Sequence, residues 1–304
     1  MNRPELQSQP IQSGDASILA VVEELTVSLR PAGITDPRRV AIDVVAALLG
    51  VPRTWPMLNR DVTVDTAIVT SARSAVRMLG AGAPFAYAVG SVCFRHLNLF
   101  VDQRVLIPRP ETEVLVGEVL ERMEAMRPGS ASWGTALDVG TGSGAIALSL
   151  ASEGRFDRVI ATDASLDALD VARINASRSA AMLNAEVEFR HGSLLSPVRD
   201  VKVTALVSNP PYIAYSEAET LPASVRDWEP PIAVLSAQNG IAATAAILRG
   251  GVRVLESGGV IGLEVDERRA SLVAELMMGH PGYTGVGVGL DLTGRERFVF
   301  ASRR

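Results

Sequence analysis

The tetrapeptide Asn209-Pro210-Pro211-Tyr212 combines residue types that could hold a reacting group. It follows an apolar run over 203–208 that is typical of a buried strand. The side-chain oxygen of Asn209 and the carbonyl oxygen of Pro210 can each accept one hydrogen of a planar –NH2 group. Both prolines have a fixed φ and lack a backbone N–H, so the loop is stiff. The motif therefore predicts a site that captures an amide or amino group.

Such a site would activate a nitrogen that is a poor nucleophile by itself. The lone pair of an amide or ring-conjugated nitrogen is delocalised, and two acceptors that hold both hydrogens can draw it out and aim it. The ring of Tyr212 can cover one face of the group and leave the other open to a methyl donor. We therefore interpret Asn209, Pro210 and Tyr212 as catalytic residues, with Pro211 completing the substrate contacts. The alternative is a plain strand-ending turn, as Pro-Pro often forms.

A second candidate site is the glycine-rich segment 136–144 (ALDVGTGSG), which leads from an expected strand into a helix beginning near Ala145. Glycines permit a tight turn and close approach of a ligand, and a helix N-terminus offers free N–H groups. Asp163 ends the next strand, roughly 20 residues further on, where a carboxylate can bind ribose hydroxyls. The expected cofactor contacts are Gly140, Thr141, Gly142, Ser143, Gly144 and Asp163.

This loop does not by itself identify the cofactor. Gly140-x-Gly142-x-x-Ala145 also satisfies the dinucleotide fingerprint G-x-G-x-x-G/A. An NAD(P)-dependent dehydrogenase and a ligand-free turn are therefore alternatives on the loop alone. Hydride transfer has no use for the Asn209 motif, and the single lysine, Lys202, leaves no evident acid/base pair. S-adenosylmethionine (SAM), a methyl donor, is the better fit.

Two further residues are candidates for cofactor contacts. Asp138 directly precedes the glycines and could neutralise the donor's amino group through water, or simply cap the loop. Leu194 follows the third expected strand and could form an apolar wall for adenine, or be an ordinary core residue.

The elements that would position these residues fall into several segments. Residues 1–14 are polar and predicted to be a disordered tail, and helical spacing over 15–82 predicts a small helical domain. Alternating apolar residues predict a β-hairpin linker over 83–108. The helical segment carries no net excess of basic residues, which disfavours a nucleic-acid clamp and leaves room for protein docking.

The remaining segment, 109–304, alternates strands and helices. Strands are expected at 135–139, 158–163, 186–190, 203–208, 257–264, 284–290 and 296–302. This rhythm predicts a mostly parallel α/β sheet with helices on both faces. Only five residues separate the last two strands, so they must form an antiparallel hairpin. The result is the seven-stranded, Rossmann-like sheet of class I methyltransferases, with a reversed strand at its end.

Composition narrows the class of protein. The 304 residues are 47% hydrophobic and 21% charged, as in an ordinary globular protein. The longest apolar stretch is too short to span a bilayer and no signal peptide is evident, so a cytoplasmic protein is expected. The net charge of −5 disfavours nonspecific nucleic-acid binding. A single cysteine, Cys93, excludes an internal disulfide, and three scattered histidines give no reason to expect a metal.

With these features in place, the sequence resembles the protein-(glutamine N(5)) methyltransferases that modify peptide-chain release factors. The likeness covers nearly the whole chain after the first dozen or so residues. It is carried by VAIDVVAALLGVPR, PFAYAVGSVCF, LIPRPETE (106–113), LDVGTGSG, SNPPYI, VRDWEPP (225–231) and DLTGRERFV. LIPRPETE together with SNPPYI is much more specific than either methyltransferase motif alone.

The resemblance implies a function and a set of residue roles. The enzyme would transfer a methyl group from SAM to the glutamine amide of a Gly-Gly-Gln tripeptide in a release factor. Gly140–Gly144, Asp163 and Leu194 would contact SAM, and Asn209 would lie beside the methyl group. Arg109, Glu111 and Glu113 would shape the pocket where the hairpin meets the catalytic domain, or form an interdomain ion-pair network instead.

The sequence also departs from the family pattern. Gly192-Ser193 stands where the family usually has Gly-Asp, so an adenine-facing carboxylate is missing and SAM affinity is in doubt. Val265-Asp266-Glu267 replaces a common Ile-Gly. Two other functions stay open at this point: an adenine amino-group methyltransferase acting on DNA or RNA, because adenine presents the same –NH2 geometry, and a SAM-binding protein without catalysis.

Overall fold

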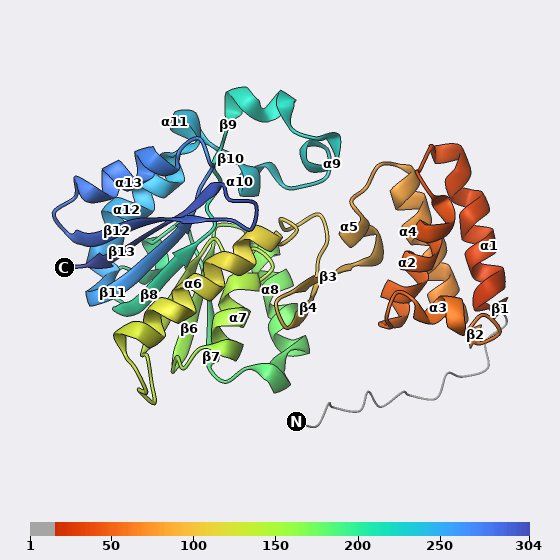
Figure 1. Cartoon of the computed structure of the whole chain (residues 1–304), viewed down its shortest axis with the longest axis horizontal. Coiled ribbons are helices and arrows are strands. Elements are labelled where there is room, and N and C mark those ends of the chain that lie inside the picture. Colours follow the sequence, from red (N-terminus) through yellow and green to blue (C-terminus); the bar gives the residue numbers. More distant parts are fainter. Residues whose placement is uncertain (1–15) are drawn as a thin grey trace. The chain divides into compact units, whose positions relative to one another are not determined.

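The computed structural model describes residues 16–304 and divides after Ser91 into two compact units, each of which is described by itself. Figure 1 shows the elements of both units. The tail expected over 1–14 lies outside the described residues.

The first unit is helical. Its helices begin at side-chain caps: Ser17 accepts from the N–H of Ala20, and Asp36 accepts from the N–H of Arg39. Pro37 occupies the first turn of its helix, where no backbone donor is needed. The elements are β1 (Ala16–Ser17), α1 (Ile18–Leu29), η1 (Arg30–Ala32), α2 (Pro37–Leu49), α3 (Trp55–Leu58), β2 (Thr63–Val64), α4 (Thr66–Gly80) and α5 (Phe85–Val89). Helices α1, α2 and α4 enclose an apolar core that includes Ile18, Leu25, Leu29, Val44 and Val76.

The segment 83–108 differs from the expected long hairpin. A short helix, α5, occupies its beginning because Pro84 starts the turn and Gly90, with φ of 69°, ends it. The hairpin itself is confined to β3 (Ser91–Phe94) and β4 (Leu97–Phe100). Beyond β4 the chain turns at Asp102, whose carboxylate accepts from the N–H of Arg104, and no strand forms before α6.

The second unit is built on a seven-stranded sheet, as the strand rhythm predicts. The strands are β5 (Thr135–Val139), β6 (Arg158–Asp163), β7 (Glu186–His191), β8 (Val203–Ser208), β11 (Leu255–Glu264), β12 (Tyr283–Leu290) and β13 (Glu296–Arg303). Their order is β12-β13-β11-β8-β5-β6-β7. Strand β13 runs antiparallel to both β11 and β12, and the other neighbours pair in parallel. The expected seven-stranded sheet with a reversed strand near its end is thereby confirmed.

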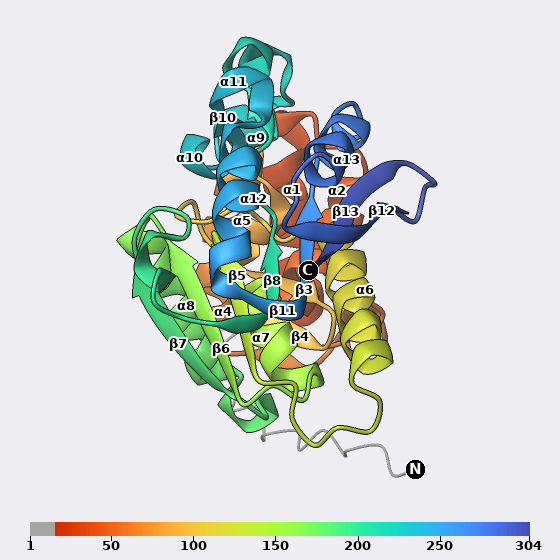
Figure 2. The ribbon, with the colours of Figure 1, turned by 90° about the vertical axis from the view of Figure 1, so that its left-hand side faces the viewer.

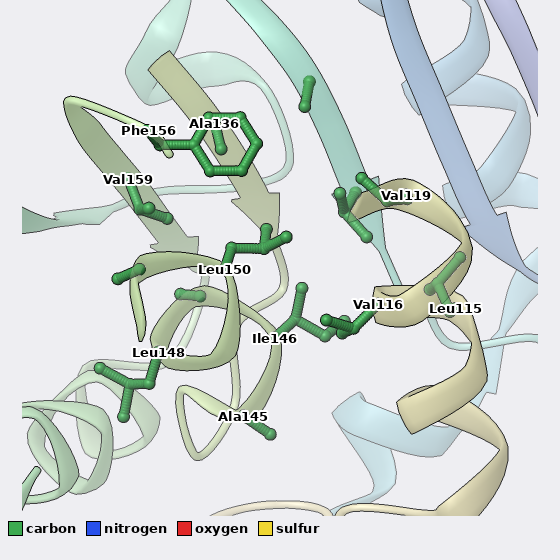
Figure 3. Packing of buried hydrophobic residues seen from close by; sticks show 14 of the residues in the cluster. Leu115, Val116, Val119, Ala136, Ala145, Ile146, Leu148, Leu150, Phe156 and Val159 are labelled. Carbon is green, nitrogen blue, oxygen red and sulfur yellow. The ribbon is translucent and has the colours of Figure 1, made fainter. Parts of the chain in front are cut away.

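Alternation along the strands divides the apolar residues between two cores. Ala136, Val207 and Phe300 face a core shared with α6 (Pro110–Met126) and α7 (Ala145–Glu153). Their strand neighbours Leu137, Leu206 and Ala301 face a second core with α12 (Ala242–Val254) and α13 (Ala270–Met278). Figure 3 shows Val116 of α6 directed toward Ile146 of α7 within the first core. Figure 2 shows α6 and α12 on opposite sides of the sheet.

The remaining elements connect these layers. They are α8 (Leu166–Arg178), η2 (Ala180–Met182), η3 (Ser196–Val198), β9 (Ile213–Ala214), η4 (Tyr215–Thr220), α9 (Ala223–Arg226), α10 (Pro231–Val234), β10 (Leu235–Ser236) and α11 (Ala237–Gly240). The excursion from β9 to α11 begins directly after the Asn209 motif and is closed by parallel pairing of β9 with β10. Across residues 16–304, no helix combines the length and apolar character needed to cross a membrane.

Candidate active site

The glycine loop and the Asn209 motif follow neighbouring strands. Val139 ends β5 and Ser208 ends β8, and these two strands pair in parallel near the centre of the sheet. The helices that follow them, α7 and α12, lie on opposite faces of the sheet. Ligands of open α/β sheets bind at such a switch point, beyond the carboxyl ends of the strands. The topology therefore brings the two sequence motifs to one place.

The glycine loop is held against the strand beside it. The N–H groups of Gly140 and Thr141 both donate to the carbonyl of Thr162, at 2.8 and 2.9 Å. The N–H of Gly142 donates to Oδ2 of Asp163 at 2.9 Å, and Oδ1 of Asp163 accepts from the N–H of Ser165 at 2.9 Å. Because a carboxylate has about four acceptor sites, Asp163 retains lone pairs for a ligand.

The conformation of the loop requires its glycines. Gly140, Gly142 and Gly144 have φ values of 76°, 54° and 86°, in the left-handed region that side chains disfavour. A Cβ on Gly140 or Gly142 would meet open space, whereas a Cβ on Gly144 would lie 3.2 Å from Leu148. The first two glycines therefore leave room for a ligand, and the third permits close packing onto the helix. Thr141 and Ser143 are buried between them.

Asp138 is a buried brace of this loop, which it holds through two hydrogen bonds. Its Oδ2 accepts from the hydroxyl of Thr141 at 2.7 Å and from the N–H of Ala147 at 3.1 Å. The residue is fully buried, and its Oδ1 has no partner within the described chain. Burial raises the pKa of Asp138 to about 7. Of the two roles weighed for Asp138, the hydrogen bonds agree with the brace, and the residue does not line the cavity described next.

A cavity of about 400 Å³ opens above the loop. Gly140, Gly142, Asp163, Leu194 and Asn209 are part of its wall, together with apolar residues of the loops around β9 and β10. This volume falls within the range of about 300–1,000 Å³ typical of small-molecule sites. The loop, the carboxylate and the Asn209 motif, which lie far apart in the sequence, thus share one cavity.

Leu194 fits both interpretations offered by the sequence. It lines the cavity, and it also packs against the core on the α12 side of the sheet. Its φ is 50°, an uncommon value for a leucine, in the turn that follows β7. Ser193 lines the cavity as well, at the position where the family pattern has an acid.

A second cavity, of about 160 Å³, also borders the Asn209 motif. Tyr212, Arg109 and Glu229 are among its lining residues. Four residues line both cavities: Leu106, Asn209, Pro211 and Ala233. Asn209 thus stands between a larger and a smaller space. Pro210 is buried and lines neither cavity, and no donor among residues 16–304 reaches its carbonyl oxygen.

Asn209 is connected to a buried acid through a hydroxyl. Its Nδ2 donates to Oγ1 of Thr112 at 3.1 Å, and Oγ1 of Thr112 donates to Oε2 of Glu264 at 2.6 Å. Thr112 lies in the first turn of α6, and Glu264 ends β11 with no exposed surface. Burial raises the pKa of Glu264, opposed by its hydrogen bond to Thr112 and by the nearby charge of Arg297.

Tyr212 is held by the same acid. Its hydroxyl donates to Oε1 of Glu264 at 3.3 Å and accepts from Arg297 at 2.8 Å. The guanidinium of Arg297 lies 5.1 Å from the centre of the tyrosine ring and 3.6 Å from Glu264. Burial raises the pKa of Tyr212 above its ordinary value, so the hydroxyl keeps its proton. Both ends of the tetrapeptide are therefore tied to Glu264.

The three charged residues of the 106–113 motif have different surroundings. Arg109 forms an ion pair with Glu229, at 2.6 and 2.7 Å, and both line the smaller cavity. Burial raises the pKa of Glu229, and the charge of Arg109 opposes that shift. Glu111 approaches Arg295 at 3.8 Å, and Glu113 accepts from Arg95 through its backbone carbonyl. Neither glutamate lines either cavity.

The backbone N–H groups of the glycine loop indicate which cofactor fits. A dinucleotide needs loop N–H groups for its pyrophosphate. Here the N–H groups of Gly140, Thr141 and Gly142 are already taken by Thr162 and Asp163. SAM carries no phosphate, and it needs a ribose acceptor, an apolar wall and room beside the loop. Asp163, Leu194 and the open space at Gly140 meet those needs.

Sequence reasoning missed several residues of this site. Thr112, Glu229 and Glu264 lie inside or beside motifs that are evident in the sequence, but no role for them was assigned there. Arg297 lies in the closing segment DLTGRERFV and was likewise missed. The sequence offers one signal for them: each is a polar or charged residue in or beside a motif, and such a side chain needs a hydrogen-bonding partner when it is buried. No group of three or more potential metal ligands gathers anywhere between residues 16 and 304.

Comparison with known proteins places these features in context. A family model described as PrmC N-terminal domain matches residues 20–90, and one described as Methyltransferase small domain matches 117–224. The Release factor glutamine methyltransferase of Rhodopirellula baltica is 34% identical, over 93% of this chain and 95% of its own. That of Moorella thermoacetica is 40% identical, over 76% and 78% of the two chains.

Two solved structures share the fold. A methyltransferase from Pyrococcus furiosus aligns with a TM-score of 0.50 and 18% identity, covering 68% of this chain and 89% of its own. The hMettl16 catalytic domain, in complex with MAT2A 3′UTR hairpin 6, aligns with a TM-score of 0.53 and 12% identity, covering 78% and 81% of the two chains. At these identities the likeness shows the fold alone.

Proposed function

The chain belongs to the release factor glutamine methyltransferase family, and we propose that its two cavities hold SAM and a glutamine side chain on either side of Asn209. The reaction is methyl transfer to the side-chain amide nitrogen of the glutamine in the Gly-Gly-Gln motif of peptide-chain release factors. The observation that carries the assignment of the two cavities is that Asn209 and Pro211 line both of them.

The larger cavity is the proposed donor site. Asp163 would accept the ribose hydroxyls with the lone pairs that Gly142 and Ser165 leave free. Gly140 and Gly142, which line the cavity, would provide the close backbone approach, with Thr141, Ser143 and Gly144 completing the loop, and Leu194 would form an apolar wall. When bound, SAM supplies an electrophilic methyl group.

The smaller cavity is the proposed acceptor site. Its volume of about 160 Å³ is less than half that of the donor cavity and suits one side chain better than a nucleoside. Oδ1 of Asn209 and the carbonyl oxygen of Pro210 would accept the two amide N–H bonds, which draws the nitrogen lone pair out of conjugation. The ring of Tyr212 would cover the amide plane, with Pro211 beside it.

The proton that leaves the acceptor nitrogen needs no strong base at the site. Two carboxylates beside the motif, Glu229 and Glu264, are paired with Arg109 and with hydroxyl donors, respectively. Positioning by Asn209 and Pro210 would therefore account for the acceleration, and the proton would leave to solvent after transfer.

The same family membership supports the wider role. We place the protein in the cytoplasm, where release factors act in translation termination. An adenine acceptor would present the same –NH2 geometry to Asn209, but the small second cavity and the acidic net charge of −5 favour a protein substrate.

The experiment is transfer of labelled methyl from SAM to a purified release factor. The control substrate is the same factor with its Gly-Gly-Gln glutamine changed to alanine. Label on the first and not on the second supports the proposed reaction. Label on neither, with SAM binding demonstrated by calorimetry, contradicts it, and label on nucleic acid in a lysate would then favour the adenine alternative.

A further inference from the structure

The side-chain amide of Asn209 ends in an oxygen and an –NH2 group, and only the oxygen can accept the hydrogens of a substrate. An asparagine amide carries an acceptor oxygen on one side and a donor –NH2 on the other, and it can rotate to exchange them. If the –NH2 faced the acceptor cavity, Asn209 would repel the amide hydrogens it is meant to hold. The activity therefore depends on which way this amide is turned.

The direction of the hydrogen bonds at Thr112 determines how the side-chain amide of Asn209 is oriented. The hydroxyl of Thr112 has one proton, and it lies 2.6 Å from Oε2 of Glu264. An ionised carboxylate can only accept, so the proton of Thr112 points to Glu264. Toward Asn209 the hydroxyl can then only accept, and the group that it faces at 3.1 Å must be the –NH2. Oδ1 is left on the opposite side, with no donor from the described residues.

The side chains that bond to Glu264 favour its ionised, accepting form, against burial, which raises its pKa. Glu264 receives the hydroxyl of Tyr212 on Oε1, and the guanidinium of Arg297 lies 3.6 Å from the same oxygen. Burial, the largest influence on the pKa of Glu264, and the charge of Glu111 both oppose ionisation. One carboxylate at the end of β11 thus directs Thr112 and anchors the tyrosine of the same tetrapeptide.

We infer that Thr112 and Glu264 are positioning residues that fix the amide of Asn209 with its oxygen toward the acceptor cavity. This rests on the proposed function, and it deepens it by naming what orients the catalytic asparagine. Neither residue needs to touch the substrate. The competing explanation is that Thr112 merely satisfies a buried acid, in which case its loss would affect stability and not the reaction.

The test removes the hydroxyl while keeping the shape. Thr112→Val should lower kcat for a release factor by about 10–100-fold, as loss of a residue that orients a catalytic group does. The dissociation constant for SAM should not change, because Thr112 does not line the donor cavity. Thr112→Ser keeps the hydroxyl and should restore most of the rate.

A matched control is available in the same unit. Thr204 is also a buried threonine, at the opposite end of β8, and its hydroxyl donates to the carbonyl of Trp133 at 2.5 Å. Thr204→Val should lose comparable stability and keep kcat. If Thr112→Val matches Thr204→Val in both stability and rate, the inference is overturned.

Coupling to Asn209 separates positioning from a general disturbance. Thr112→Val should slow the wild-type enzyme but leave the residual single-turnover rate of Asn209→Ala unchanged, because the group being oriented is already absent. An equal slowing in both backgrounds would contradict the inference. Should Thr112→Val not fold, Thr112→Ala removes the same hydroxyl without placing a methyl group against Glu264.

A second readout needs no acceptor protein. The side-chain –NH2 of Asn209, assigned by NMR from its absence in Asn209→Ala, should exchange with solvent slowly in the wild type and in Thr112→Ser, and faster in Thr112→Val. Equal exchange in wild type and Thr112→Val would overturn the inference. This result stands whether or not a release factor is methylated, so failure of the inference and failure of the proposed function are distinguishable.

Discussion

The loop beside the donor cavity is stabilised by residues that are close in the sequence, whereas the Asn209 motif is stabilised by residues that are distant. Thr141, Ala147 and Gly142 bond to partners 3, 9 and 21 positions away. Asn209 and Tyr212 bond to partners 97, 52 and 85 positions away, on α6, β11 and β13. The two halves of the site therefore depend on different parts of the fold.

This difference has a functional consequence. A local loop can bind a common cofactor wherever the strand–loop–helix unit occurs. The acceptor half needs β11 and β13 paired in register, with α6 packed beside the sheet, before Asn209 is oriented. Changes in the acceptor half should therefore reduce transfer while the donor still binds, and changes in the donor half should do the reverse.

The largest effect should follow from Asn209→Ala. Loss of one of the two acceptors for the amide hydrogens should reduce kcat by about 10²–10³-fold, as loss of one preorganised polar group in an active site does. Binding of SAM should be largely retained, because Asp163 and the glycine loop are intact. Single-turnover transfer of labelled methyl and calorimetry of SAM binding measure the two quantities. A near-normal kcat would refute the role given to Asn209.

Arg109→Met tests whether the acceptor half depends on its buried ion pair. The side chain of Glu229 is 1% exposed, so removal of Arg109 leaves a buried carboxylate without its partner. We expect the free energy of unfolding to fall by about 1.5–3 kcal/mol, and the KM for the release factor to rise.

The control for this change is Arg226→Met, which removes an arginine from an exposed pair with Asp227. Exposed pairs contribute little, so neither stability nor KM should change appreciably. Urea titration and steady-state kinetics measure the effects. If both variants behave alike, the Arg109–Glu229 pair has no special role in the acceptor cavity.

Most of the fold of the second unit could be predicted because its determinants are local. The strands at 135–139, 158–163 and 203–208 have the predicted bounds, since each is a largely apolar run that ends at Asp163 or just before Gly140 or Asn209-Pro210. The hairpin of β12 and β13 follows from its short connection. The segment 83–108 was harder, because Pro84 and Gly90 define a helix too short for periodicity to reveal.

The candidate site could be predicted only in part, for the same reason. Motif residues such as Asn209 and Asp163 are visible in the sequence, and the structure brings them to one cavity. The partners of Asn209 and Tyr212 are not visible, because Thr112 and Glu264 meet only when α6 packs beside β11. A motif indicates which side chain acts, and the tertiary fold decides which way it is turned.

Asp163→Ala should weaken SAM binding and leave kcat nearly unchanged, the reverse of Asn209→Ala. The variant loses the proposed ribose acceptor and the bond that holds the N–H of Gly142. Hydrogen bonds to charged groups contribute about 1.5–3 kcal/mol, so SAM should bind roughly 10–100-fold more weakly. At saturating SAM, kcat should remain close to that of the wild type. Asp167→Ala, an exposed aspartate in the first turn of α8, is the control and should bind SAM normally.

The last prediction concerns the stability of the fold and not the reaction, at Asp138, the most local brace of the donor half. Burial raises its pKa to about 7 from an ordinary 3.8, so the folded protein binds a proton over a pH range in which the unfolded chain has lost it. That contribution to stability is fully present below pH 3.8 and is lost as the pH rises through 7.

Asp138→Asn should remove this pH dependence. Between about pH 4 and 7, the wild type should lose stability relative to the variant by up to about 1.4 kcal/mol per pH unit, and above that range the difference should level off. Urea titrations at several pH values measure it, with Asp157→Asn as a control near the opposite end of the sheet. Parallel curves for wild type and Asp138→Asn would mean that Asp138 stays ionised when buried. The donor half would then need a counter-charge that its own loop does not supply, and it would resemble the acceptor half in depending on distant residues.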